Sequence, residues 1–358
     1  MKTIKTIYDS KKNSFALLEF LLAILIIYFH AYPLYYGPST TNSDLFSRYF
    51  SVQLGNVVVA MFFVISGFFI IDSLNRSKSI GEYLKKRIKK IYPPLIFFLL
   101  VFSLIIGPLV ADPGGTKYLL HTSNYMNYIT SNLLFFQNNS YSIVGIFEKL
   151  PYPLAISGSL WTIKHTIYTY LCIIPINKYI IKDKKNNYGF CIFYLILFII
   201  ALISEFGILD KFYGTVATWN PNLSLFIEFK SFVKLLYFFC SGILINLFKD
   251  KIKVNLFTVS IFIIIFILGT VFKKNTYLIY LFIPYLTILL GSIKLPFSIK
   301  PYSYHIYIWG FAVQQLIIFY KPNILLLNYI VLGVVISIIF GLVSYYCTEN
   351  IIYNWRKK

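Results

Sequence analysis

One histidine in this sequence is well placed for acid–base chemistry. His30 closes an apolar run that covers residues 14–34. An imidazole titrates near neutrality, so it can take a proton from a hydroxyl nucleophile and return it to a leaving group. Glu19 precedes it by eleven residues, so on a helix the two share one face and lie about 16 Å apart along the axis. The residues alone leave two roles open for His30: a general base, or a helix-end histidine bonded to interfacial water.

Polar groups also interrupt two other apolar runs. Ser66 and Gly67 break the run 54–74, where small residues allow close packing of membrane helices. Gln314 and Gln315 stand next to each other in the run 303–320. Polar side chains inside a membrane span are costly and often functional. The two glutamines indicate either a hydrated, substrate-lined interior or hydrogen bonds between helices.

A third group of polar residues opens the run 159–177. Trp161, Lys164 and His165 follow one another closely there. The cationic side chains could line a polar cavity or extend to the membrane surface. In the run 225–247, Glu228 is predicted to pair with a lysine across the helix bundle.

The segment 83–94 is unusually basic for a loop between two apolar runs, and it contains Arg87. A guanidinium offers two parallel donors to a phosphate. The segment could therefore hold the phosphates of a nucleotide-bearing cofactor, or it could lie against anionic lipid.

These residues must be positioned by membrane helices, because the composition excludes a soluble fold. Of the 358 residues, 58% are hydrophobic and only 13% are charged, against about 25% charged in a typical soluble domain. The net charge of +20 is spread in short clusters between apolar runs, which argues against a nucleic-acid partner. The four cysteines form no CxxC pair, so we expect no metal site.

The sequence predicts an all-α, polytopic membrane protein of about ten transmembrane helices in a single domain, residues 1–358. Each span needs about 20 apolar residues. The basic opening stretch is followed by an apolar run without a cleavage site, which indicates a retained first helix. Most of the 33 lysines and arginines fall in segments that place both termini in the cytoplasm. The predicted spans are 14–34, 54–74, 92–111, 159–177, 188–207, 225–247, 254–272, 277–293, 303–320 and 324–347.

The order of these motifs resembles the acyltransferase 3 family. His30 is similar to the histidine of the family's Arg-(ten residues)-His motif, and residues 62–68 match its FFVISGF segment. The stretch from Arg87 to Pro93 is similar to an RxxRIYP run. Residues 151–153 and 158–162 resemble the PYP and GSLWT signatures, and residues 303–315 resemble the late SYGxYIYGxPVQQ motif. Two positions depart from the pattern: Glu19 replaces an arginine, and Thr166 replaces a glutamate.

The resemblance implies a membrane-bound O-acyltransferase of the bacterial inner membrane, surrounded by lipid and compatible with a homo-oligomer. It would move an acyl group, most simply acetyl, from acetyl-CoA to a sugar hydroxyl of a surface polysaccharide or lipid-linked glycan. By the same resemblance His30 would be catalytic. Donor-binding residues would be Ser66, Arg87, Lys90 and Tyr92, and substrate-binding residues would be Trp161, Gln314 and Gln315.

Two other functions stay open from the sequence. The first is a transporter or flippase of a glycan or lipid, whose polar intramembrane residues line a pathway. The second is a catalytically impaired acyltransferase homologue, because Glu19 and Thr166 replace charged groups of the family pattern.

Overall fold

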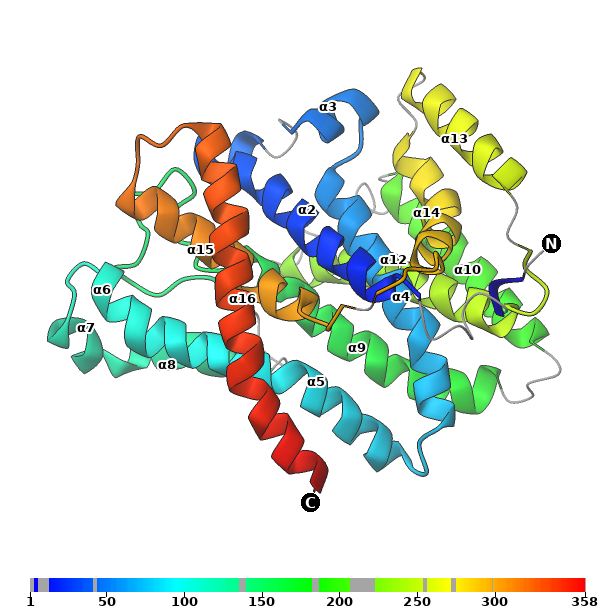
Figure 1. Ribbon diagram of the computed structural model, residues 1–358, viewed down its shortest axis with the longest axis horizontal. Coiled ribbons are helices and arrows are strands. Elements are labelled where there is room, and N and C mark those ends of the chain that lie inside the picture. Colours follow the sequence, from blue (N-terminus) through cyan, green and yellow to red (C-terminus); the bar gives the residue numbers. More distant parts are fainter. Residues whose placement is uncertain are drawn as a thin grey trace.

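The protein is a bundle of helices in its computed structural model, which describes residues 3–5, 13–40, 44–134, 140–181, 187–206, 223–253, 256–271, 275–297 and 299–357 (Figure 1). The longer helices are α2 (Phe15–Tyr36), α4 (Leu54–Asn75), α5 (Ile80–Val101), α8 (Thr122–Leu133), α9 (Trp161–Pro175), α10 (Tyr188–Glu205), α12 (Leu223–Leu247), α13 (Leu256–Val271), α14 (Asn275–Gly291), α15 (Ser303–Tyr320) and α16 (Leu326–Lys357). The shorter ones are η1 (Pro38–Thr40), α3 (Leu45–Phe50), η2 (Phe102–Ile106), α6 (Gly107–Val110), α7 (Thr116–Leu120), η3 (Gly158–Leu160) and η4 (Ile176–Ile180).

The all-α prediction is confirmed, and the chain is a multi-pass membrane protein. Six helices in the described part of the chain are long and apolar enough to cross a membrane. Each of the ten predicted spans overlaps one helix or one continuous run of helices. The prediction of about ten crossings goes further than the six helices that meet the length and hydropathy requirement, so it stays a prediction.

Two glycines hold α4 and α12 together at the centre of the bundle. A Cβ atom added at Gly67 of α4 would lie 1.9 Å from the carbonyl oxygen of Phe239, and one added at Gly242 of α12 would lie 2.1 Å from that of Val64. The two backbones therefore touch at a distance that only glycine permits. The close packing predicted from Gly67 is confirmed.

The basic segment 83–94 is helical, and its interpretation as a loop was wrong. Helix α5 begins at Ile80, where the Ser79 side chain accepts a hydrogen bond from the Glu82 backbone N–H. Lysine, arginine and leucine are good helix formers, so the charges do not interrupt the helix. The helix continues through Pro93 and Pro94 into its apolar second half. The basic side chains therefore occupy the helical turns that precede the apolar half.

Residues 112–158, which join the third and fourth predicted spans, contain α7 and α8, and α8 packs against α5. The Tyr118 hydroxyl donates to the Ser103 carbonyl at 3.0 Å, and the Tyr92 hydroxyl donates to the Leu133 carbonyl at 3.3 Å. The segment is therefore anchored to the helices beside it.

Several segments that the charge pattern assigns to the cytoplasm lie together. Thr3 pairs with Lys253 and Asn13 pairs with Lys294 through isolated bridges, and Lys5 forms an ion pair with Asp250 at 3.1 Å. The N-terminal segment thus lies beside the ends of α12 and α14. This arrangement agrees with the prediction that these segments share one side of the membrane. The rest of the basic opening stretch, residues 6–12, and the lysines at 182–186 lie outside the described residues.

Candidate active site

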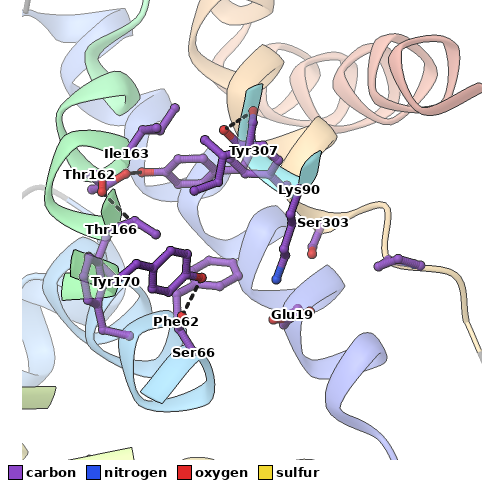
Figure 2. Close-up of a pocket in the computed structure, with 15 residues that line it drawn as sticks. Glu19, Phe62, Ser66, Lys90, Thr162, Ile163, Thr166, Tyr170, Ser303 and Tyr307 are labelled. Atoms are coloured by element: carbon purple, nitrogen blue, oxygen red, sulfur yellow. Dashed lines mark hydrogen bonds between the residues drawn. The ribbon is translucent and has the colours of Figure 1, made fainter. Parts of the chain in front are cut away.

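One cavity, called the main cavity below, lies where α2, α4, α5, α9 and the start of α15 converge, and measures about 890 Å³ counted with its mouth (Figure 2). Lys90 and Pro301, at one end, are exposed, so the cavity opens there, on the side predicted to be cytoplasmic. Its lining residues are Glu19, Val59, Phe62, Phe63, Ser66, Lys90, Ile91, Thr162, Ile163, Thr166, Tyr170, Pro301, Ser303, Tyr304 and Tyr307.

Two hydroxyl pairs line the wall formed by α9. The Ser66 and Tyr170 hydroxyls lie 2.8 Å apart, and so do those of Thr162 and Tyr307. Thr162, Thr166 and Tyr170 follow one another at intervals of four residues, so one face of α9 presents all three to the cavity (Figure 2). The wall can therefore donate hydrogen bonds to a ligand oxygen in surroundings that are otherwise apolar.

Glu19 and Lys90 place opposite charges near the mouth of the cavity. Glu19 comes from α2 and Lys90 from α5, and both extend into the cavity beside Ser303 (Figure 2). Neither side chain forms a hydrogen bond or a close ion pair with another described residue. Glu19 is half-buried, whereas Lys90 is exposed at the mouth. A carboxyl group without a hydrogen-bond partner in a membrane helix is costly, which favours a role of Glu19 in binding or catalysis.

Arg87 and Tyr92, also on α5, lie next to the cavity but do not line it. The Arg87 guanidinium lies 5.7 Å from the centre of the Tyr83 ring and 5.5 Å from that of Tyr170. It also donates to the Ser73 hydroxyl at 2.7 Å. Tyr170 is thus a shared wall, with Arg87 on one side and the cavity on the other. Of the four predicted donor-binding residues, the structure brings Ser66 and Lys90 together in the cavity.

His30 does not line the main cavity, but it packs against a residue that lies one turn of α15 beyond the lining residue Tyr307. Its ring packs edge-on against Phe311 with 5.3 Å between ring centres, and Phe311 follows the cavity residue Tyr307 by four residues of α15. One turn corresponds to about 5.4 Å. The ring nitrogens form no hydrogen bond with the described residues. Its catalytic role stays a prediction.

The predicted substrate-binding residues are divided between two places. Trp161 lines a second cavity, on the other side of α9 from Thr162. Gln314 donates to the Ile27 carbonyl at 2.9 Å, and Gln315 donates to the carbonyls of Tyr152 and Ala155 at 2.8 Å each. Both glutamines are fully buried. They make hydrogen bonds between segments, one of the two alternatives that the sequence left open.

Sequence reasoning did not assign Tyr170 and Tyr307 to the site. The spacing of Thr162, Thr166 and Tyr170 contains a signal for the wall of α9, because residues four apart share a helix face. The prediction that Glu228 pairs with a lysine is confirmed, since Lys164 Nζ lies 3.0 Å from its carboxylate. No group of three or more His, Cys, Asp and Glu that could hold a metal ion occurs among the described residues.

A helical membrane protein with a charged mouth and a hydroxyl-lined interior is suited to acyl transfer, and comparison with known proteins gives the family. Residues 13–347 match the sequence profile described as an acyltransferase domain. The chain belongs to the acyltransferase 3 family and is an O-acyltransferase.

Two curated proteins illustrate the relationship. The chain is 24% identical over 319 residues to an O-acetyl transferase of Shigella phage Sf6, and the match covers 86% of each chain. It is 28% identical over 221 residues to nodulation protein 10 of Rhizobium leguminosarum bv. viciae. That match covers 60% of this chain and 55% of the relative. No solved structure shows significant similarity.

Proposed function

We propose that this protein moves an acetyl group from acetyl-CoA to a sugar hydroxyl of a surface polysaccharide or lipid-linked glycan, in the inner membrane of a bacterium. Family membership supports acyl transfer, and the phage relative named O-acetyl transferase supports acetyl as the group.

The observation that carries the proposal is the change in chemistry along the main cavity. Acetyl-CoA has a phosphate-rich end and a narrow pantetheine arm that carries the thioester. Lys90 lies at the mouth, and Lys86 and Arg87 lie on the preceding turn of α5. Cationic side chains there attract the phosphates, while the largely apolar interior accepts the arm. The donor would then enter with its thioester pointing toward Tyr307.

The hydroxyl pairs at the closed end are suited to the reaction itself. The acceptor oxygen attacks the thioester carbonyl, forming a C–O bond as the C–S bond breaks. The Thr162 and Tyr307 hydroxyls lie 2.8 Å apart, and both are within reach of the Ser159 carbonyl, at 3.0 and 3.3 Å. One hydroxyl donates to that carbonyl, and the other can turn its proton to the oxygen on which negative charge develops. His30, whose ring packs against Phe311, takes the proton of the acceptor and returns it to the coenzyme sulfur, which leaves as a thiol. Exclusion of water from this end limits hydrolysis of the thioester.

An assay with purified protein in lipid nanodiscs tests the function. Acetyl-labelled acetyl-CoA is supplied with a glycan extract from the host envelope, and labelled ester is measured. Transfer to glycan is expected. Binding of acetyl-CoA without transfer would identify an impaired homologue, and absence of both would favour the transporter. In cells, deletion of the gene should remove one acetyl ester from the surface glycan.

A further inference from the structure

A second cavity, of about 640 Å³ counted with its mouth, lies between α4, α9, α10 and α12. Asn56 at its rim is exposed, and it lies at the end of α4 that is predicted to face outward. The cavity therefore opens on the side opposite to the mouth at Lys90. Its polar lining consists of Asn56, Trp161, Glu205, Lys230, Ser231 and Lys234.

One layer of side chains separates the two cavities. Val59 of α4 lines both of them. On α9, Trp161 lines the second cavity and its neighbour Thr162 lines the main one. A molecule in the second cavity would therefore approach the hydroxyl pair of Thr162 and Tyr307 from the side opposite to the donor.

The second cavity has the groups that bind a sugar. The Glu205 carboxylate accepts hydrogen bonds from Lys234 at 2.6 Å and from the Tyr280 hydroxyl at 2.8 Å, both through Oε1. Oε2 has no hydrogen bond to a described residue. Glu205 thus offers a hydrogen-bond acceptor and Lys234 a donor beside it. Two neighbouring hydroxyls of a sugar can bind to such a pair. The Trp161 indole adds an aromatic surface for the C–H face of a pyranose.

We propose that this second cavity binds the acceptor sugar, through hydrogen bonds to Glu205 and Lys234 and stacking on Trp161. The inference rests on the proposed function. A hydroxyl of the bound sugar then reaches past Val59 into the main cavity and attacks the thioester carbonyl. A C–O bond forms as the C–S bond breaks, so the acetyl group passes from sulfur to oxygen, and the sugar's proton passes through the base to the coenzyme thiolate.

The chain offers a matched control for this site. Besides the ion pair of Glu205 and Lys234, α12 forms another one with α9. In it Lys164 Nζ lies 3.0 Å from Glu228 Oε2. Neither residue lines either cavity. Glu205→Gln and Glu228→Gln therefore make the same chemical change, one inside the proposed site and one outside it. Ser231→Leu narrows the site without removing a charge.

The test is direct binding, which does not need turnover. The full-length protein in nanodiscs is titrated with methyl glycosides of glucose, galactose, rhamnose and N-acetylglucosamine while tryptophan fluorescence is recorded. We expect saturable quenching by at least one glycoside that is lost in Trp161→Phe. Affinity should fall about tenfold or more in Glu205→Gln, as removal of a charged hydrogen-bond partner implies. Ser231→Leu should weaken binding as well, and Glu228→Gln should leave it unchanged.

The proposal is overturned if none of the glycosides quenches, if quenching persists in Trp161→Phe, or if Glu205→Gln and Glu228→Gln behave alike in folded protein. Equilibrium binding of labelled acetyl-CoA is measured on the same samples and should be the same in all variants. Sugar binding without acetyl transfer would refute the proposed function and leave the sugar site standing. Acetyl transfer with an unchanged acceptor KM in Glu205→Gln would refute the sugar site alone.

Discussion

Polar side chains of the main cavity and the two glutamines of α15 differ in whether they have hydrogen-bond partners within the protein. Gln314 and Gln315 give their amide N–H groups to backbone carbonyls of α2 and of the segment before η3. Glu19 and Lys90 face an open space without a close partner in the described structure. Glu19, Gln314 and Gln315 all interrupt apolar helices, and the sequence alone gives each of them the same reason to be considered functional.

The difference teaches where to look for function in a membrane bundle. A polar side chain that is bonded to the backbone of another segment holds the fold together, so its removal should lower stability. One that faces a cavity without a partner is available to a ligand, so its removal should change binding or rate. The following predictions test this division.

The largest effect is expected at His30. Replacing His30 with Ala should lower kcat for acetyl transfer by about 10²- to 10⁴-fold, the usual contribution of a general base. The folded fraction in detergent should be unchanged, because the ring makes no hydrogen bond with the described residues. His121→Ala is the control, since His121 is exposed at the end of α7. Full activity in His30→Ala would remove this histidine from the mechanism.

Gln315→Leu should act on stability. It leaves two buried carbonyls, those of Tyr152 and Ala155, without their donor, at a cost of about 1–3 kcal/mol. Thermal unfolding in detergent should show a lower midpoint, whereas KM for acetyl-CoA should not change. Gln53→Leu serves for comparison, because that amide contacts the exposed side chain of Asn56. An unchanged unfolding midpoint with an altered KM for acetyl-CoA would instead place Gln315 among the ligand-binding residues.

Lys90→Gln should act on donor binding. Loss of the ammonium at the mouth is expected to raise KM for acetyl-CoA about tenfold, as for a charged hydrogen bond to phosphate. The midpoint of unfolding should remain the same. Lys85→Gln removes a charge from the exposed surface of the same helix and should change KM much less. Equal effects of the two substitutions would indicate a diffuse attraction rather than a site at Lys90.

Glu19→Gln should have the smallest effect, and in the opposite direction. Its side chain lines the cavity with Lys90, and the negative charge that it carries when ionised offsets part of the positive charge there. Removing it should lower KM for acetyl-CoA about twofold, the size of a weak ion-pair interaction. Steady-state kinetics at several acetyl-CoA concentrations measure this change. A fall in kcat as large as that expected for His30→Ala would instead identify Glu19 as the base.

The sequence predicted the helices well, because membrane spans need long apolar runs and these are visible without tertiary context. It also predicted the contact at Gly67 and the pairing of Glu228. It misjudged the basic part of α5, where charges were interpreted as a loop although lysine and arginine favour helix. Charge alone does not distinguish a solvated helix from a turn.

The cavity wall was harder to predict. The chain has 31 tyrosines, and most of them would be assigned to packing or to the membrane interface. Tyr170 and Tyr307 become site residues only because α9 and α15 face each other across the cavity, a long-range contact that no local pattern reveals. The sequence also placed Glu19 and His30 on one face of a helix, yet only Glu19 lines the main cavity. Which part of that face meets the cavity depends on the neighbouring helices, and no local pattern reveals them.

The glycine contact between α4 and α12 limits how the protein can move. Because the two backbones meet at Gly67 and Gly242, neither helix can slide along the other, and the two must travel as one rigid unit. Any opening of the main cavity that admits the bulky coenzyme therefore has to come from the other helices that line it, α2, α5, α9 or α15, moving relative to α4 and α12. Hydrogen exchange should therefore be slowest along α4 and α12 in the resting protein and should change most in α5 when the coenzyme binds.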